Sequence, residues 1–350
     1  MKRNSLYTIL GISLVVVVLL TMLNFTMKKP NSTLNGFDRS FVGKNLILLK
    51  EIPFAEPVRE IAGMTDSAIY ILTKDPYKLL RYDKAADKMS ELMLKIPKLD
   101  KLASNFTITV QYPYAYVVGA NVPAIIRYDL TTDAYITHAL DNIFSRSVTF
   151  FGNYVALQKF DTTKTDQHLC RVNLLDESTI QQHHVVDKLH DAGFATSGIL
   201  NYDATTDQIT YVHFYSNRIL YLDTNLNMIN ESSTIDTFRQ YQAKAKGTLR
   251  NGKASYGYTA PPKILNPIST VNEGKLYVLS YVRADNEKDV RRKGNSTIDL
   301  YDIAKMQYRG SLYIPRIEGK RMNSFKVAKG KLYVVYEHKL MIYDMNDLLQ

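Results

Sequence analysis

The sequence has 350 residues, of which 45% are hydrophobic and 22% are charged. This composition predicts a packed core and excludes wholesale disorder, and the length allows one large or two ordinary domains. The 44 lysine and arginine residues exceed the 34 acidic residues, which gives a net charge of +10. Such a balance favours anionic partners, although a basic protein can also carry this charge only for solubility. The single cysteine, Cys170, excludes an internal disulfide and is expected to be a small buried side chain.

The chain opens with a short basic segment, and an uncharged apolar run follows at residues 6–27. A helix of that length rises about 1.5 Å per residue and can cross a hydrocarbon core of ~30 Å. A cleaved signal sequence is the alternative, but its apolar part is typically only about 7–15 residues long and ends in small residues. We therefore expect residues 1–29 to be a single-pass anchor in the inner (cytoplasmic) membrane and residues 30–45 to be a linker. Residues 46–350 would form a domain in the periplasm or outside the cell.

One short pattern then recurs along the chain, in which a strand-like segment ends in an acidic or amide residue. The copies end at Asp83, Asp129, Asn173, Asp223, Asp302 and Asp344. Their spacings are 46, 44, 50, 79 and 42 residues, and units of about 40–50 residues are typical of β-propeller blades. The longest spacing fits one unit plus an insertion of about 30–35 residues. We expect the repeated acid or amide to form the turn after its strand rather than to bind a ligand.

Other strand-like segments surround each copy and are rich in Tyr, Val, Ile and Leu, which favour buried sheets. The segment directly before each copy is found at 68–73, 114–119, 153–158, 208–214, 275–281 and 331–336. Candidate inner strands are found at 58–64, 106–112, 147–152, 267–271 and 324–328, and candidate outer strands at 93–97, 134–140, 179–186 and 311–315. The last unit lacks an outer strand, but residues 46–53 share an Ile-Pro ending with 93–97 and 311–315. We therefore expect residues 46–53 to complete the last sheet, which would remove an exposed edge.

This repeat, which covers residues 46–345, resembles the TolB-like and NHL-like six-bladed propellers, in particular the exported ones of Bacteroidetes. The predicted fold is thus all-β: a six-bladed β-propeller whose N-terminal strand closes the last blade, preceded by one transmembrane helix. The resemblance does not imply a particular activity, because propellers carry many unrelated functions.

Three long segments, at 159–167, 231–266 and 282–297, are predicted to emerge at the same end of the ring. Functional loops collect where a rigid scaffold presents them, and arginine together with tyrosine is typical of binding surfaces. Residues 231–266 carry 6 − 2 = +4 charges and residues 282–297 carry 5 − 3 = +2. Arg316 and its neighbours should join this rim. The candidate binding rim consists of Arg239, Tyr241, Lys244, Lys246, Tyr256, Tyr258, Arg283, Arg291, Arg292, Lys320 and Arg321.

No nucleophile, metalloprotease, phosphate-loop or dinucleotide motif is present in the sequence. The expected inner strands also offer too few carboxylates for a calcium site of about six to eight oxygens. We therefore predict no catalytic residues, no metal, no cofactor and no nucleic-acid partner. The favoured function is an extracytoplasmic interaction module for a protein, a peptide or an anionic glycan. The alternative is a metal-assisted hydrolase or lactonase in the central channel, which converging carboxylates or amides at the channel mouth would favour.

Overall fold

The computed structural model describes residues 11–22, 34–42, 46–99, 102, 105–250 and 253–345. The chain divides into two compact units, residues 1–35 and residues 36–350. In the first unit residues 11–22 are helical, while residues 6–10 and 23–27 of the predicted anchor lie outside the described residues. Within the described part of the chain, no helix combines the length and the apolar character needed to cross a membrane.

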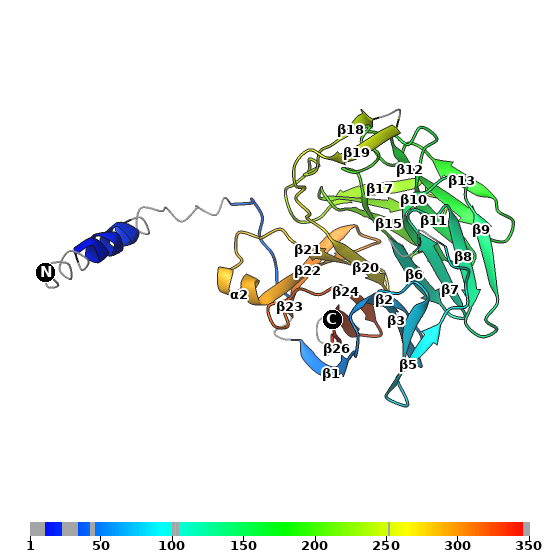
Figure 1. Cartoon of the computed structure of the whole chain (residues 1–350), viewed down its shortest axis with the longest axis horizontal. Helices are drawn as coiled ribbons and strands as arrows, with labels where there is room; N and C mark the ends of the chain where they lie inside the picture. Colours follow the sequence, from blue (N-terminus) through cyan, green and yellow to red (C-terminus); the bar gives the residue numbers. More distant parts are fainter. Residues whose placement is uncertain are drawn as a thin grey trace, which may run out of the picture. The chain divides into compact units, whose positions relative to one another are not determined.

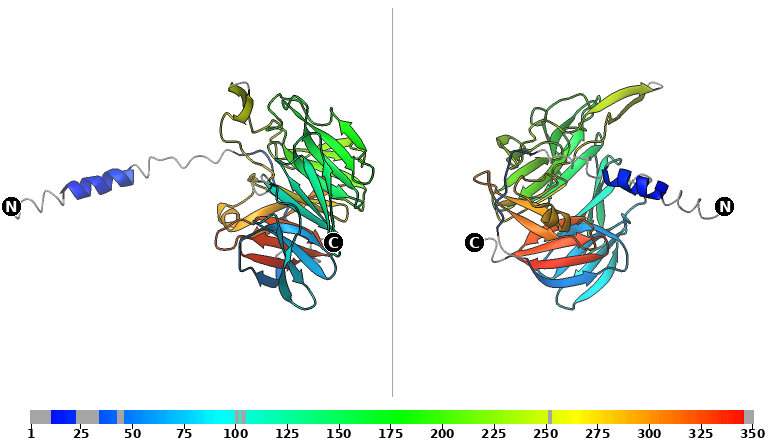
Figure 2. Two further views of the ribbon diagram at one scale, coloured as in Figure 1. Left: turned by 45° about the vertical axis from the view of Figure 1, so that its right-hand side comes forward. Right: turned by 90° about the vertical axis from the view of Figure 1, so that its left-hand side faces the viewer.

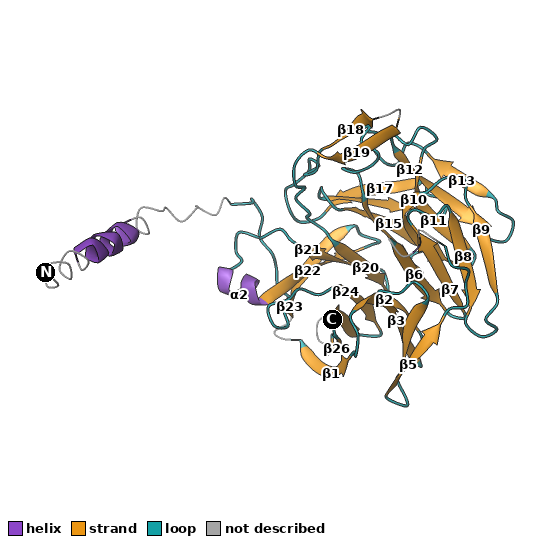
Figure 3. Ribbon diagram, viewed as in Figure 1, coloured by secondary structure: helices purple, strands orange, loops and turns teal. Residues whose placement is uncertain are grey.

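The second unit is an all-β six-bladed propeller, with each blade a four-stranded antiparallel sheet of described residues (Figures 1 and 3). Blades 1 to 3 consist, from the inner to the outer strand, of β2 (Val58–Met64), β3 (Ala68–Thr73), β4 (Lys78–Asp83) and β5 (Lys88–Met93); β6 (Phe106–Gln111), β7 (Tyr114–Gly119), β8 (Ala124–Asp129) and β9 (Tyr135–Ala139); and β10 (Phe144–Phe150), β11 (Tyr154–Phe160), β12 (Gln167–Asn173) and β13 (Thr179–Gln182).

Blades 4 to 6 follow the same order, and the last blade takes its outer strand from the start of the domain. They consist of β14 (Gly198–Asp203), β15 (Gln208–His213), β16 (Arg218–Leu222) and β17 (Met228–Ser233); β20 (Ile268–Asn272), β21 (Lys275–Ser280), β22 (Asn295–Asp302) and β23 (Gln307–Pro315); and β24 (Ser324–Ala328), β25 (Lys331–Tyr336), β26 (Lys339–Asp344) and β1 (Ile47–Pro53). The inner strands β2, β6, β20 and β24 gather towards the middle of the ring in Figure 1.

The middle strands of each blade are covered on both faces because neighbouring blades pack against them. Every residue of β3 is buried. Its sequence, AIYILT, shows little alternation of apolar and polar residues because neither face of the strand meets water. The outer strand β5 is instead mostly exposed and reads KMSELM. The hydrophobic core is thus divided among the spaces between successive blades, and one such cluster joins side chains of blades 1 and 2.

The ring is closed by β1, which pairs with β26 in antiparallel register, with Ile52 opposite Leu340. Ile52 is buried in the cluster that also contains Leu340 and Ile342. The inner strands β24 and β2 contact one another at the same junction. The predicted closure of the last blade by the N-terminal strand is confirmed.

The repeated acidic position caps the turn that follows the third strand of a blade. The Asp83 carboxylate accepts hydrogen bonds from the backbone N–H groups of Ala85 and Ala86, at 3.1 and 2.9 Å. The equivalent side chains also accept from backbone N–H groups two or three residues ahead, at Asp129, Asn173, Asp223 and Asp302. At these positions the predicted turn role is confirmed.

The predicted outer strand at 93–97 is wrong, because β5 occupies residues 88–93. The chain reverses direction in a short turn that contains Asp87, whose φ is 52°. The fourth strand therefore begins and ends earlier in the sequence than the Ile-Pro ending at residues 96 and 97 had suggested. The apolar residues Leu94 and Ile96 follow the strand and are buried in the core between blades 1 and 2.

Similar differences occur in blades 3 and 4. Strand β13 ends at Gln182, so the predicted strand 179–186 is too long, and Val185 and Val186 are buried against blade 4 instead. The inner strand β14 and the outer strand β17 of blade 4 were not predicted. The predicted insertion between blades 4 and 5 contains a separate hairpin of β18 (Ala245–Arg250) and β19 (Lys253–Tyr258).

A short N-terminal arm, residues 36–42, lies against blade 5, although the sequence had suggested a linker here. The Gly36 N–H donates to a carboxylate oxygen of Asp285 at 2.8 Å, and the Asp285 N–H donates to the Phe37 carbonyl at 2.9 Å. The ring of Phe41 stacks on Tyr313 with 4.1 Å between centroids. The arm is thus fixed by backbone bonds and by aromatic packing.

Arg39 forms the centre of the arm's contact with blade 5, and its side chain is fully buried. Its Nε and Nη2 atoms donate to the two oxygens of Asp299 at 2.7 and 2.9 Å, and its Nη1 donates to Glu287 at 2.7 Å. Nη2 also donates to Ser280. Burial alone would lower the pKa of Arg39, but the two carboxylates raise it above its ordinary value, so the guanidinium stays charged.

Replacing Arg39 with alanine should destabilise the propeller by about 3–5 kcal/mol, because two buried carboxylates lose their cation. Urea unfolding monitored by circular dichroism measures this loss. The control is Arg309→Ala, since Arg309 is half exposed and lies 3.9 Å from Asp302; it should cost less than about 1 kcal/mol. Equal losses from the two variants would contradict a central role for Arg39.

Candidate functional site: an arginine cleft between blades 5 and 6

Two connections meet at the junction of blades 5 and 6. The first joins β21 to β22 and contains the short helix α2 (Asp289–Gly294); the second joins β23 to β24. The Arg316 N–H donates to the Gly294 carbonyl at 2.8 Å, so the two connections are tied together. This contact confirms that a loop within one blade and the connection to the next blade emerge at the same end here.

A narrow crevice opens between these connections, and three arginines line it. We call it the arginine cleft; it is lined by Ser280, Tyr281, Arg292, Asn295, Ser296, Thr297, Arg316 and Arg321. Arg292 donates to the Tyr281 carbonyl at 3.0 Å, and the Arg321 guanidinium lies 4.2 Å from the centre of the Tyr281 ring. Both contacts position a cation without neutralising it.

The Nε atom of Arg316 is buried and has no hydrogen-bond partner among the described residues. A buried donor without an acceptor is unfavourable by about 1–3 kcal/mol, and more when the group is charged. Within the described part of the chain, no carboxylate forms an ion pair with Arg292, Arg316 or Arg321. The cleft therefore holds donors and positive charge that a bound anion would satisfy.

The pKa values of the cleft arginines reflect the same excess of positive charge. Burial lowers the pKa of Arg316, and the neighbouring Arg321 and Arg292 lower it further. Burial also lowers the pKa of Arg292; Glu287 opposes this effect, while Arg283 and Arg321 add to it. The three guanidinium groups are thus close enough to one another to lower the pKa of Arg316 and of Arg292.

Glu287 is an acidic residue close enough to act on the charge of Arg292, but its carboxylate is already bound by other donors. Its carboxylate accepts from Arg39 at 2.7 Å and from the Ala284 N–H at 2.7 Å. Hydroxyl groups of Thr297 and Tyr313 donate to its second oxygen at 3.1 and 3.2 Å. Arg39 of the N-terminal arm and three donors of blade 5 thus hold this carboxylate together.

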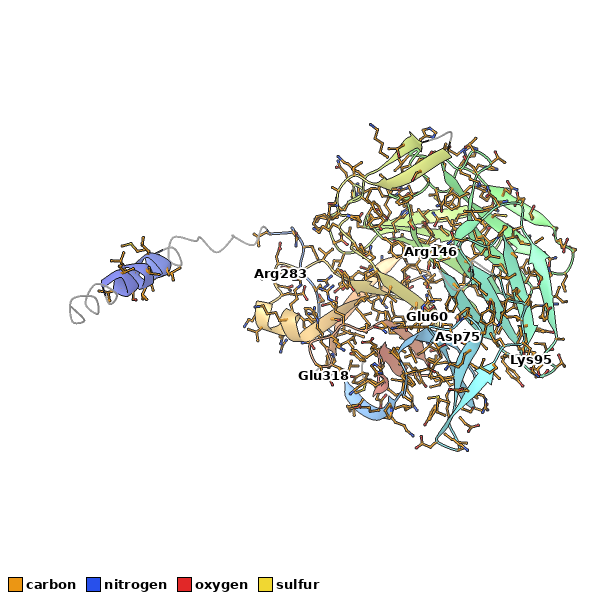
Figure 4. The ribbon with its side chains drawn as sticks, in the orientation of Figure 1. Glu60, Asp75, Lys95, Arg146, Arg283 and Glu318 are labelled. Atoms are coloured by element: carbon orange, nitrogen blue, oxygen red, sulfur yellow. The ribbon has the colours of Figure 1, made fainter. Side chains whose placement is uncertain are left out.

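The structure brings three of the predicted rim residues close to one another, namely Arg283, Arg292 and Arg321. Arg283 donates to the Glu287 carbonyl at 3.0 Å, and Figure 4 shows it on the side of the ring where α2 lies. Arg291 is exposed on α2. Lys320 is exposed and pairs with Glu337 at 3.4 Å. The sequence had placed Arg316 beside the rim but not within the site.

The remaining predicted rim residues belong to a second region around the hairpin of β18 and β19, which Figures 1 and 2 show apart from α2. Lys244 and Lys246 are exposed there. The Tyr256 ring lies across Gly247, where an added Cβ would come within 2.9 Å of it. The Tyr258 hydroxyl is 2.7 Å from that of Tyr215. The predicted rim therefore consists of two basic regions rather than one.

Two further predicted residues precede the hairpin. Arg239 is exposed, whereas Tyr241 is half-buried in a polar network. The Tyr241 hydroxyl donates to Asp187 at 2.9 Å and lies 2.6 Å from a guanidinium nitrogen of Arg218. Burial raises the pKa of Tyr241 well above its ordinary value. The ring supports the loop from within, so the structure gives Tyr241 a packing role.

The central channel was the site of the alternative, enzymatic prediction. Glu60 and Arg146 lie towards the middle of the ring in Figure 4. Burial raises the pKa of Glu60, and the cations Lys326, Arg59 and Arg146 partly oppose this effect. Among the described residues, no group of three or more His, Cys, Asp or Glu side chains is arranged to hold a metal ion. The buried Glu60 carboxylate thus lies within the influence of three cations, Lys326, Arg59 and Arg146.

Comparisons with known proteins bear on the fold. No protein-family model matches the sequence, and no curated protein matches it. The structure of virginiamycin B lyase from Staphylococcus aureus is similar, with a TM-score of 0.52, 9% identity and coverage of 86% of this chain and 99% of that one. A member of the DUF4221 family from Bacteroides vulgatus has a TM-score of 0.52 and 11% identity, and covers 88% and 98% of the two chains.

A luciferin-regenerating enzyme has a TM-score of 0.50 at 12% identity, with coverage of 87% of this chain and 96% of that one. At these identities the likeness shows the six-bladed propeller and nothing about activity. It does not confirm the TolB-like or NHL-like assignment, and it favours neither binding nor catalysis.

His213, at the end of β15, is completely buried near the Tyr241 network, and its ring lies 4.9 Å from Tyr211 and 5.5 Å from Tyr241. Burial lowers its pKa from 6.5 to about 3, and the nearby Arg218 also lowers it. At mildly acidic pH the imidazole of His213 therefore stays neutral in the folded state but is protonated in the unfolded chain. The corresponding stability is present above pH 6.5 and is lost as the pH falls towards the folded pKa.

Acidification from about pH 7.5 to about pH 5 should lower the free energy of unfolding by about 2 kcal/mol through His213 alone. The reason is that the imidazole gains a proton in the unfolded chain but not in the folded state. Urea unfolding at both pH values measures this difference. His213→Phe keeps a ring of similar shape and should reduce the loss on acidification by that amount. The control is His184→Phe at an exposed histidine. The same pH dependence in the wild type and in His213→Phe would exclude His213 as a source of acid sensitivity.

Proposed function

We propose that this protein is an extracytoplasmic binding module whose arginine cleft receives an anionic group carried by a partner. The partner is a protein, a peptide or an anionic glycan, and nucleic acid is not expected. The basic hairpin of β18 and β19 provides a second contact region for the same partner. No cofactor enters this function.

One observation carries the proposal: three guanidinium groups share a crevice in which the described residues provide no paired carboxylate, and the buried Arg316 Nε has no acceptor. A folded protein rarely leaves a buried charged donor without a partner. A ligand anion would remove both the repulsion among the arginines and the unsatisfied donor. Arginine suits this role because its planar guanidinium presents several fixed donors and stays charged.

The proposal includes a membrane anchor. The uncharged run at residues 6–27, with Lys2 and Arg3 before it and Lys28 and Lys29 after it, supports a single-pass segment in the inner membrane. A short N-terminal tail before a large domain supports export of the propeller to the periplasm or the cell exterior. The resemblance to exported TolB-like and NHL-like propellers of Bacteroidetes is consistent with this location.

Reversing the charge of the cleft should abolish capture of the natural partner. The test variant is the full-length Arg292→Glu/Arg321→Glu protein, used for crosslinking in the native host and compared with the wild type by mass spectrometry of captured proteins and glycans. Both residues are in the cleft, and each reversal replaces attraction to an anion by repulsion.

The matched control is Lys88→Glu/Lys305→Glu, which reverses two exposed cations at turns between the third and fourth strands of blades 1 and 5. Those turns lie at the end of the ring opposite the cleft, so capture should be unchanged. Undiminished capture by the cleft variant, with thermal stability like that of the wild type, would refute the proposed site.

The anchor requires a separate experiment, because it does not depend on the cleft. The full chain should remain in the membrane fraction after extraction with alkaline carbonate, since a spanning helix is held by burial of its apolar side chains. Replacing two leucines of the run, Leu19→Arg and Leu20→Arg, should release the protein or block its export. Release of the wild-type chain by carbonate would contradict a spanning anchor.

A further inference from the structure

The dimensions and the charge of the arginine cleft restrict which anion it can accept. This inference rests on the proposed function, because it specifies the group that the cleft would bind. The crevice has a free volume of about 10 Å³, which is close to the minimum that holds one water-sized group. A ligand therefore cannot enter whole; it can place one oxygen inside while its other oxygens remain at the mouth.

We propose that the arginine cleft binds a phosphate monoester group, with one phosphate oxygen in the crevice at Arg316 and the others at the mouth, facing Arg292 and Arg321. The ligand class is thus a phosphorylated side chain or a phosphorylated sugar, and both present the same terminal group.

The charge of the cleft supports a dianion over a carboxylate. The three arginines contribute three positive charges, and the carboxylate of Glu287, which acts on Arg292, is already bound by Arg39. A carboxylate would neutralise only one of these charges. A phosphate monoester carries about −1.5 to −2 charges near pH 7 and offers three strong acceptor oxygens. It therefore relieves more of the repulsion among the guanidinium groups.

The geometry also supports a group with three terminal oxygens. Arg292 and Arg321 both contact Tyr281, one through its carbonyl and the other over its ring. Arg316 and Arg321 belong to the connection from β23 to β24, whereas Arg292 belongs to the connection from β21 to β22. The Arg316 N–H donates to the Gly294 carbonyl across the two connections. Donors thus come from two separate segments of chain around one opening. A tetrahedral group can accept from all of them, whereas the two oxygens of a planar carboxylate lie in a single plane.

The site is held in place before any ligand binds. The side chain of Ser296 is buried in the crevice wall, and Ser280 is fixed by its contact with Arg39. The N-terminal arm keeps Glu287 bound, so no rearrangement of that carboxylate is needed to admit an anion. Such preorganisation reduces the entropy lost on binding.

The test uses the full-length chain in detergent and phenyl phosphate as the probe, with affinity measured by isothermal titration calorimetry. Binding should weaken by about 10-fold to 100-fold in Arg316→Met and in Arg292→Met, because each removes one charge-assisted hydrogen bond. The matched control is Arg309→Met, which removes an exposed arginine on β23 and should leave the affinity unchanged. Phenyl sulfate and benzoate, each a monoanion on the same ring, should bind at least about tenfold more weakly.

A second readout comes from pH. Between about pH 5 and about pH 7 phenyl phosphate should bind more tightly as its second proton is lost near pH 6, while benzoate should show no such rise. A phosphoserine peptide and glucose 6-phosphate then distinguish the two sources of the group, and the tighter ligand identifies the source.

Each outcome separates this inference from the proposed function. If phenyl sulfate or benzoate binds as tightly as phenyl phosphate, the preference for a phosphate monoester is wrong although the cleft still binds anions. If no probe binds while the charge-reversed cleft still loses its partner, the phosphate assignment fails and the proposed function stands. If neither the probes nor the partner depend on the arginines, both are overturned.

Discussion

The pairing of β1 with β26 is the constraint on which the rest of the structure depends. Without β1 the last blade would have only three strands, and the unpaired backbone groups of β26 would face solvent or another chain. Here the first strand after the N-terminal arm supplies the outer edge of the last blade, and Ile52 is buried beside Leu340. With the ring closed, each blade packs between two neighbours, and the loops at either end are held at fixed positions.

The charge pattern at the junction of blades 5 and 6 follows from that rigidity. Arg39 satisfies Asp299 and Glu287 inside the arm contact, so the acidic charge of this region is already used. Arg292, Arg316 and Arg321 line the neighbouring cleft with no carboxylate paired to them among the described residues, and Ser280 and Thr297 contribute to both groups. One buried ion-pair cluster and one unbalanced cationic cleft therefore lie side by side.

Much of the fold could be predicted from local sequence, because a blade is a local unit. The repeated acid shows where each third strand ends, since its carboxylate caps the next turn, as Asp83 does. The cleft could not be predicted in the same way. Which cations are neutralised depends on contacts between distant segments: Arg39 and Glu287 are 248 residues apart. Tyr241 resembled a surface anchor in sequence, yet Asp187 and Arg218 hold it within the loop.

The position of the N-terminal arm has a mechanical consequence. The chain reaches blade 5 at Gly36 and Arg39 before it reaches the outer edge of blade 6 at β1. Tension applied through the residues that precede Gly36 would thus be borne first by the contacts of Gly36 and Phe37 with Asp285, and then by Arg39 with its two carboxylates. The pairing of β1 with β26 would carry none of that tension until the ion pairs of Arg39 had broken.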